Sequence, residues 1–175
     1  RDAVALELAD FFRMVGLSLR QLMDAREAVD AAAARLAAER RPGATETSRL
    51  AALEAGGGLA GELALRNECA RLSEDPAIAL FVACLNRLTL DFAPPALAAR
   101  AGSTNAAQLA DALARGDGDA AAAAVCAGLP ELEAALASGG RPVAPPCPDA
   151  GGSAAAHRSG EVVAALMGDL RNEGE

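Results

Sequence analysis

Residues 17–40, LSLRQLMDAREAVDAAAARLAAER, constrain the fold of this chain more than any other segment. Their apolar residues recur every three or four positions, which places them on one stripe of an α-helix. Arg26 lies in the middle of that stripe, and an unpaired charge in an apolar site is costly. The sequence therefore predicts a helical core in which an anionic group, from the protein or from a ligand, meets Arg26. The stripe consists of Leu19, Leu22, Met23, Arg26, Val29, Ala33 and Leu36.

The composition of the whole chain also favours close-packed helices. Hydrophobic residues make up 52% of the 175 residues, aromatic residues make up 2%, and there is no Trp or Tyr. A core of Leu, Ala, Val and Ile with few β-branched residues favours helices over strands. We expect an all-α fold, an antiparallel bundle of about six to seven helices.

Turn and cap residues divide the first 138 residues into these helices. We expect helices close to residues 2–14, 18–39, 45–54, 59–72, 75–92, 104–115 and 117–138. Pro76 suits a first helical position, and Pro130 is expected to kink the last helix near its middle. The expected N-caps are Ser18, Thr45 or Thr47, Asp75, Ser103 or Thr104, and Asp117 or Asp119.

The composition changes after residue 138. Residues 139–156, GGRPVAPPCPDAGGSAAA, contain four Pro and four Gly, which is typical of a linker. Residues 157–175 hold one amphipathic set of apolar residues and are expected to form a short helix. We therefore expect a helical domain over residues 1–138, a linker and the start of another module. Because the chain opens on Arg1 without Met, we expect a piece of a longer protein.

Charge and hydropathy exclude two classes of partner for this segment. The net charge is -8 and no Lys/Arg cluster suited to phosphate neutralisation occurs, which argues against direct nucleic-acid binding. The longest apolar stretch, residues 77–85, is too short to span a bilayer, and we expect no signal peptide. We expect a cytoplasmic protein with no membrane contact.

The residues that could carry catalysis are too few and too scattered for an enzyme. The four cysteines form no C-x-x-C pair and are expected to be reduced core residues. His157 is the only histidine and lies outside the helical domain, so Cys126 has no histidine to activate it. Residues 56–58 are three glycines without the Lys and Ser/Thr of a phosphate loop. We expect no enzymatic activity.

Three segments in order resemble the FadR-type C-terminal domain of GntR-family transcription regulators. LRQLMDAREAVDAAAARLAAER resembles its first long helix, NECARLSEDPAIALFVACLNRL its central helix pair, and NAAQLADALARGDGDAAAAAVCAGL its last pair. Together they cover roughly residues 17–136. The tail, RSGEVVAALMGDL, is similar to the opening helix of the winged-helix DNA-binding domain of the same regulators.

The resemblance implies a dimeric helical bundle that holds a small organic effector, often a carboxylate. Many members also hold a divalent metal through an acidic residue, a histidine one turn later and two more histidines. Those positions fall here on Glu62, Arg66, Ala106 and Gly128. Only Glu62 retains a metal-ligating side chain, so we predict neither a metal site nor a cofactor.

The predicted ligand-binding residues are Arg26, Glu62, Arg66 and Asn86. The resemblance places an arginine near the pocket at position 26, yet Arg26 could instead pair with a buried carboxylate such as Glu62. Glu62 and Arg66 are one helical turn apart and form either a solvated surface pair or an interior pair that supplies charge to an anionic effector. Asn86 is either a pocket group or a satisfied core amide, and Asn67 either a pocket group or solvated.

The function predicted from these features is that of an effector-binding and dimerisation domain of a GntR/FadR-type regulator. It would form a homodimer, bind a small carboxylate without metal and contact DNA only through a winged-helix module outside this segment. A ligand-free helical dimerisation or scaffold module is the alternative, and an adaptor unrelated to DNA is a third hypothesis. The first predicts that Arg26 and Arg66 converge on a cavity, and the second that Arg26 pairs with Glu62.

Overall fold

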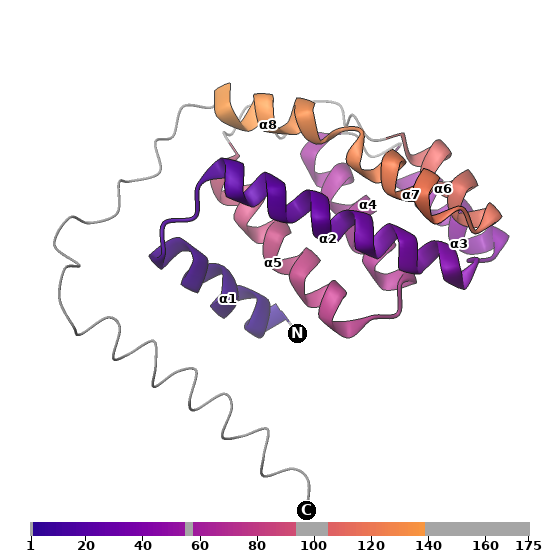
Figure 1. The fold of residues 1–175 in the computed structure, drawn as a ribbon, viewed down its shortest axis with the longest axis horizontal. Coiled ribbons are helices and arrows are strands. Elements are labelled where there is room, and N and C mark those ends of the chain that lie inside the picture. Colours follow the sequence, from indigo (N-terminus) through magenta and orange to yellow (C-terminus); the bar gives the residue numbers. More distant parts are fainter. Residues whose placement is uncertain (1, 55–57, 94–104, 139–175) are drawn as a thin grey trace, which may run out of the picture. The chain divides into compact units, whose positions relative to one another are not determined.

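Helices joined by short turns make up the residues that the computed structural model describes, which are 2–54, 58–93 and 105–138 (Figure 1). The all-α class expected from composition is confirmed, since no strand occurs in those ranges. All described residues belong to one compact unit, Arg1–Arg141. The expected linker, 139–156, and terminal helix, 157–175, lie outside the described residues. The helices are α1 Asp2–Met14, α2 Leu19–Arg40, α3 Ala44–Glu54, α4 Gly58–Leu72, α5 Pro76–Phe92, α6 Ala106–Arg115, α7 Gly118–Cys126 and α8 Leu129–Ser138.

Three of the expected N-caps are confirmed. Ser18 begins α2 with a capping box, in which its hydroxyl accepts from the Gln21 N–H at 3.3 Å and the Gln21 side chain accepts from the Ser18 N–H at 3.0 Å. Asp75 accepts from the first backbone N–H groups of α5, directly before Pro76. Asp117 accepts from the third residue of α7 at 3.0 Å. Local capping chemistry thus sets where these helices begin.

The caps expected for α3 and α6 were wrong. The Thr47 hydroxyl donates to backbone carbonyls at the start of α3, so this residue lies inside the helix, which begins at Ala44. The carboxylate of Glu46 accepts from the Gly43 N–H at 3.2 Å instead. Asn105 caps α6 by accepting from the Gln108 N–H at 3.0 Å, and asparagine is as good a cap as serine. Residues 103 and 104 lie outside the described residues.

The expected last helix is two helices, α7 and α8. The helix breaks at Ala127 and Gly128, before Pro130, which is the second residue of α8. Proline is tolerated in a first turn because no intrahelical acceptor exists there for its missing N–H. By length and composition alone, Gly118–Ser138 could cross a membrane, with a mean hydropathy of 1.4. Half of that stretch is buried inside the protein, as is typical of a core helix.

Helix α2 occupies the centre of the bundle and packs against α7, α4, α5, α6 and α8 (Figure 1). Its contact with α7 is lined by alanines, which lets the two backbones approach closely. Ala33, Ala34, Ala37 and Ala38 of α2 are buried in the same core cluster as Ala121 and Ala124 of α7. Helix α1 packs separately against α5. The three helices α2, α4 and α5 pack against one another and enclose the site described next.

Candidate functional site

Four charged side chains are buried where α2, α4 and α5 meet. Arg26 and Asp30 come from α2, and Glu62 and Arg66 come from α4. Arg26 is 0% exposed, and the other three side chains are also buried. Together with Asn86 and Thr89 of α5, which are buried beside them, we refer to these residues as the central polar cluster.

Helical spacing brings the members of the cluster together. Arg26 and Asp30 are one turn apart on α2, and Glu62 and Arg66 are one turn apart on α4, so each pair projects from one face of its helix. Because the helices pack against each other along these faces, two local ion pairs merge into one cluster of four charges. This merging depends on tertiary packing.

Asp30 connects the two ion pairs. Its Oδ2 atom accepts a hydrogen bond from the Arg66 Nε at 2.9 Å and lies 3.5 Å from the Arg26 Nε. The Nη1 atom of Arg66 donates to the Glu62 Oε1 at 2.8 Å. Two arginines and two carboxylates give the cluster a formal charge of zero, which offsets much of the cost of burying charge.

Hydrogen bonds extend the cluster toward the protein surface. Arg26 donates to the Thr89 hydroxyl at 2.8 Å and to the Asn86 side-chain carbonyl. The Asn86 amide donates in turn to the Leu63 carbonyl at 3.2 Å and to the Asn67 side chain at 2.9 Å. Asn67 is exposed, so a continuous polar path joins solvent to Arg26.

Two buried polar atoms of the cluster lack a hydrogen-bond partner among the described residues. They are the Nε donor of Arg26 and the Oδ1 acceptor of Asp30. Leaving a buried donor or acceptor unsatisfied costs about 1–3 kcal/mol, so such atoms are uncommon in native proteins. The Arg26 Nε is ion-paired with the Asp30 Oδ2 at 3.5 Å without a hydrogen bond, so this donor and the Asp30 Oδ1 acceptor have hydrogen-bonding capacity for a small polar molecule that offers both groups.

The two arginines differ in their electrostatic surroundings. Burial, with a smaller contribution from the charge of Arg66, lowers the pKa of Arg26 to about 10, although Asp30 and Glu62 oppose this shift. Arg66 is equally buried, but Asp30 and Glu62 together outweigh desolvation and raise its pKa above the ordinary value. Both side chains are therefore cationic at neutral pH. Nearby carboxylates compensate the charge of Arg26 less completely than that of Arg66.

The structure brings all four predicted site residues into one cluster, in which Glu62 and Arg66 form the interior pair that was one of the two alternatives, whereas the partner of Arg26 differs from expectation. The solvated alternative for Glu62 and Arg66 was wrong, because both are buried. The carboxylate nearest to Arg26 belongs to Asp30, not to Glu62. The sequence signal for Asp30 was its position one turn after Arg26, and it was overlooked. Asn86 is a hydrogen-bonded core amide, while ligand binding by these residues remains a prediction.

Of the four positions that hold metal in the family that the sequence resembles, three lack a metal-binding side chain in this chain. Ala106 is buried at the start of α6, and Gly128 lies in the break between α7 and α8. The Arg66 guanidinium donates to Asp30 and Glu62, so Glu62, the one acidic residue among these positions, is already paired with a cation. Within the described ranges, no group of three or more His, Cys, Asp or Glu could hold a metal ion.

Cys69 predicts a loss of stability at alkaline pH. Burial raises the pKa of its thiol from 9.0 to about 12, with a further contribution from Asp30. Above pH 9 the unfolded chain loses a proton that the folded chain keeps, so stability falls by about 1.4 kcal/mol per pH unit until pH 12. Urea unfolding between pH 8 and 11 should show a shallower decline for Cys69→Ala than for the wild type. Equal slopes would contradict this assignment.

Comparison with known proteins gives no family assignment: no protein-family model, curated protein or solved structure matches this chain. A function for the chain therefore has to be argued from its sequence pattern and from the geometry of the central polar cluster.

Proposed function

We propose that the helical domain is the effector-binding and dimerisation domain of a cytoplasmic GntR-family transcription regulator of the FadR type. It binds a small organic carboxylate without a metal or cofactor, acts as a homodimer and reaches DNA through a winged-helix module outside this segment. The resemblance over residues 17–136 and the all-helical bundle support this proposal.

The central polar cluster is the observation that carries the proposal. Arg26, Arg66 and Asn86 come from three helices and meet in one buried place, as expected for residues around a ligand. The Arg26 Nε can donate to a ligand carboxylate, and the Asp30 Oδ1 can accept from a ligand hydroxyl or from a protonated acid. The path of side chains through Asn86 to the exposed Asn67 gives the cluster a polar connection to solvent.

A ligand between α2, α4 and α5 would act by shifting a population of bundle conformations. Both arginines are held by residues of a neighbouring helix, Arg26 by α5 and Arg66 by α2. A carboxylate that draws either guanidinium toward itself changes how these helices pack. In a dimer, that change alters the relative placement of the two DNA-binding modules, to the extent that the ligand prefers one packing over the other.

One observation favours a ligand-free dimerisation or scaffold module as the second candidate. The two arginines and two carboxylates balance each other's charge, so the cluster needs no added anion to be neutral. In that case its role is to fix how the three helices pack, as buried ion pairs do in some proteins.

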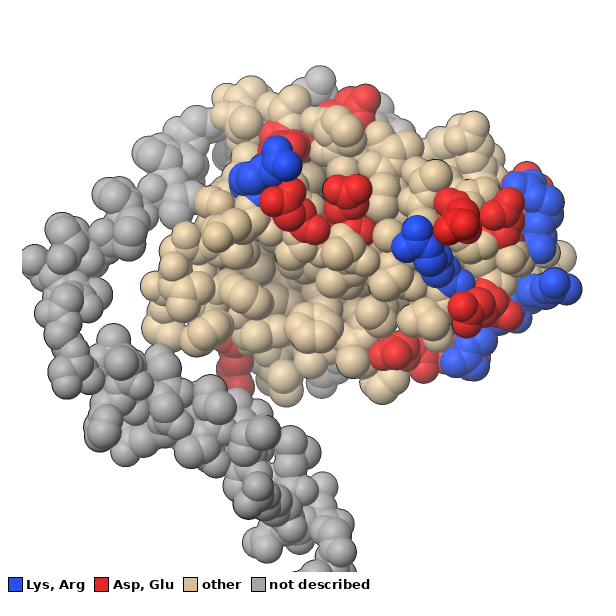
Figure 2. Space-filling model, viewed as in Figure 1, with Lys and Arg blue, Asp and Glu red and all other residues tan. Residues whose placement is uncertain are grey.

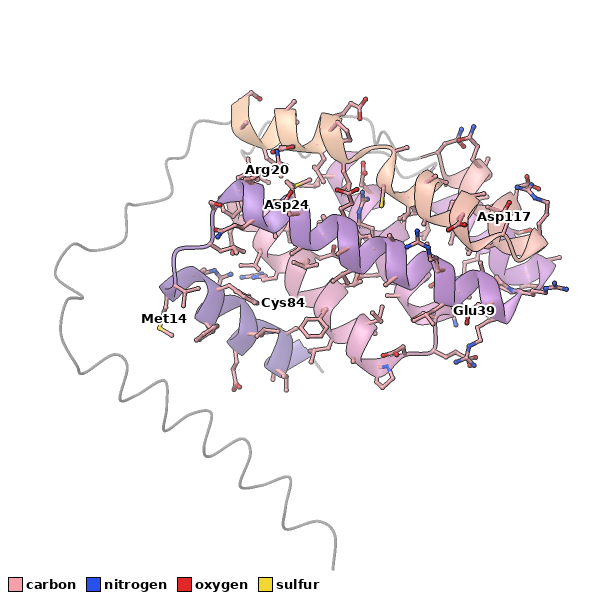
Figure 3. The ribbon with its side chains drawn as sticks, viewed as in Figure 1. Met14, Arg20, Asp24, Glu39, Cys84 and Asp117 are labelled. Carbon is pink, nitrogen blue, oxygen red and sulfur yellow. The ribbon has the colours of Figure 1, made fainter. Side chains whose placement is uncertain are left out.

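Calorimetric titration with small mono-, di- and hydroxycarboxylates distinguishes the two candidates. We expect at least one acid to bind the wild-type chain. Arg26→Lys should weaken that binding at least tenfold, because lysine keeps the charge but lacks the Nε donor and the planar fork. Arg20→Lys is the matched control, since Arg20 pairs with Asp24 at the same spacing on the exposed side of α2 (Figure 3). If no acid binds a folded wild-type chain, the scaffold candidate is the better one.

A further inference from the structure

The hydrogen-bonding capacity that remains in the central polar cluster is one donor beside one acceptor. The donor is the Arg26 Nε and the acceptor is the Asp30 Oδ1, and neither atom has a hydrogen-bond partner among the described residues. Both side chains are fully buried. The other oxygen of the same carboxylate, Oδ2, lies 3.5 Å from the Arg26 Nε. The donor and the acceptor are therefore close enough for a single ligand group to reach both.

The other polar atoms of these two side chains are already engaged within the protein. Arg26 donates through Nη1 to Thr89 and through Nη2 to Asn86, and the Asp30 Oδ2 accepts from Arg66. A guanidinium commonly binds a carboxylate through two parallel donors, but a ligand here meets a donor and an acceptor. A carboxylate on the Arg26 Nε would bring its second oxygen toward the Asp30 Oδ1. Two ionised carboxylates with no proton between them repel each other.

The charge of the surroundings also disfavours an anionic ligand. The side chains that α5 contributes to the cluster are an amide and a hydroxyl, which carry no charge. Burial raises the pKa of the two nearby thiols to about 12 and about 11, so both are uncharged at neutral pH. The two arginines and two carboxylates balance, and an added anion would leave a buried net negative charge, which is costly. The titratable groups around Arg26 and Asp30 are Glu62, Arg66 and Cys69 on α4 and Cys126 on α7.

We propose that the central polar cluster binds a neutral ligand group that carries a donor and an acceptor side by side, namely a primary carboxamide or a carboxylic acid in its protonated form. The ligand oxygen accepts from the Arg26 Nε, and the ligand N–H or O–H donates to the Asp30 Oδ1. An acid therefore takes up one proton from solvent when it binds near neutral pH, whereas an amide binds without a proton.

Asp30 is the residue that determines this selectivity, because its carboxylate supplies both the acceptor and the negative charge that excludes an anion. The inference deepens the proposed function and rests on it, since it states the form in which an acid group is bound at the same site. It also adds primary amides to the class of ligands.

Acetamide and acetate test the inference, because they have nearly the same shape and differ in charge. Each is titrated into the 175-residue chain at constant ionic strength, and binding is followed by the nitrogen-15 NMR signal of the Arg26 Nε–H, which Arg26→Lys removes and thereby assigns. At pH 7.5 we expect the dissociation constant of acetamide to be at least tenfold lower than that of acetate. Between pH 6.5 and 7.5 the constant for acetate should rise about tenfold, since its protonated fraction falls by that factor, while the constant for acetamide should not change.

Asp30→Asn should reverse the preference. The substitution keeps nearly the same shape and leaves the cluster with an excess of positive charge, so acetate should bind at least tenfold more tightly than acetamide. The matched control is Asp24→Asn, which should keep the preference of the wild type. Asp24 pairs with Arg20 at 3.0 Å on the exposed side of α2, where blue and red side chains lie together at the surface (Figure 2). If Asp30→Asn fails to fold, the pH dependence of the wild type still decides the question.

The outcomes separate this inference from the proposed function. Tighter binding of acetate than of acetamide to the wild type, or acetate binding that is independent of pH, would overturn the inference and leave a carboxylate effector in place. A folded Asp30→Asn that still prefers acetamide would also overturn it. If neither probe moves the Arg26 signal, the inference fails alone, because the calorimetric titration with larger acids tests the effector separately. A water molecule, which also offers a donor and an acceptor, would then be the better occupant.

Discussion

Replacing Asp30 with alanine is expected to lower the free energy of unfolding by about 3–5 kcal/mol, a large part of the stability of an ordinary domain. Asp30 is the carboxylate that Arg26 and Arg66 share, and its loss leaves two buried cations with Glu62 alone. Arginine cannot shed its proton to relieve this excess. Urea unfolding at neutral pH measures the loss.

A small anion should partly reverse the effect of Asp30→Ala. Formate or acetate can place a carboxylate where that of Asp30 was, so either salt should raise the melting temperature of the variant more than that of the wild type at equal ionic strength. The matched control is Asp24→Ala, which removes the exposed partner of Arg20 on the same helix and should cost less than about 1 kcal/mol. Equal losses for the two variants would contradict the geometry of the cluster.

Replacing Arg66 with methionine should be about as destabilising, by about 3–5 kcal/mol, but with the opposite excess of charge. Asp30 and Glu62 would then have only Arg26 as a cationic partner in a buried core. The side chain of Arg66 is fully buried and also donates to the carbonyls of Glu62 and Val125, so its removal breaks hydrogen bonds as well as ion pairs. Urea unfolding at pH 7.5 measures the deficit.

The pH dependence of Arg66→Met distinguishes an electrostatic cause from simple loss of packing. One of the two carboxyl groups must take up a proton for the variant to fold, so the folded state binds more protons than the unfolded state and stability rises as the pH falls. The deficit relative to wild type should therefore shrink between pH 8 and pH 5. A constant deficit would indicate a packing defect. Arg71→Met, which breaks half-exposed pairs with Glu46 and Glu68, should cost less than about 1 kcal/mol.

Local chemistry in the sequence determined most of the secondary structure. The 3.6-residue period and the Ala/Leu composition fixed the all-helical class, and Ser18, Asp75 and Asp117 fixed three helix starts because capping needs only residues two or three positions away. The α3 cap was missed because Glu46, not a threonine, satisfies the free N–H group. The kink expected at Pro130 takes the form of a break at Ala127 and Gly128, because a proline disrupts the helical turn that precedes it.

For the site, the sequence by itself determined that Arg26 is buried on an apolar stripe and requires an anionic partner, since helical periodicity fixes the face on which a residue lies. Only the tertiary structure decided which anion that is. Asp30 serves Arg26 and Arg66 together because α2 and α4 pack face to face, and Asn86 and Thr89 complete the hydrogen bonds because α5 crosses at that level. Periodicity gives the direction of a side chain within one helix, whereas the choice of partner depends on the depth and register at which separate helices meet.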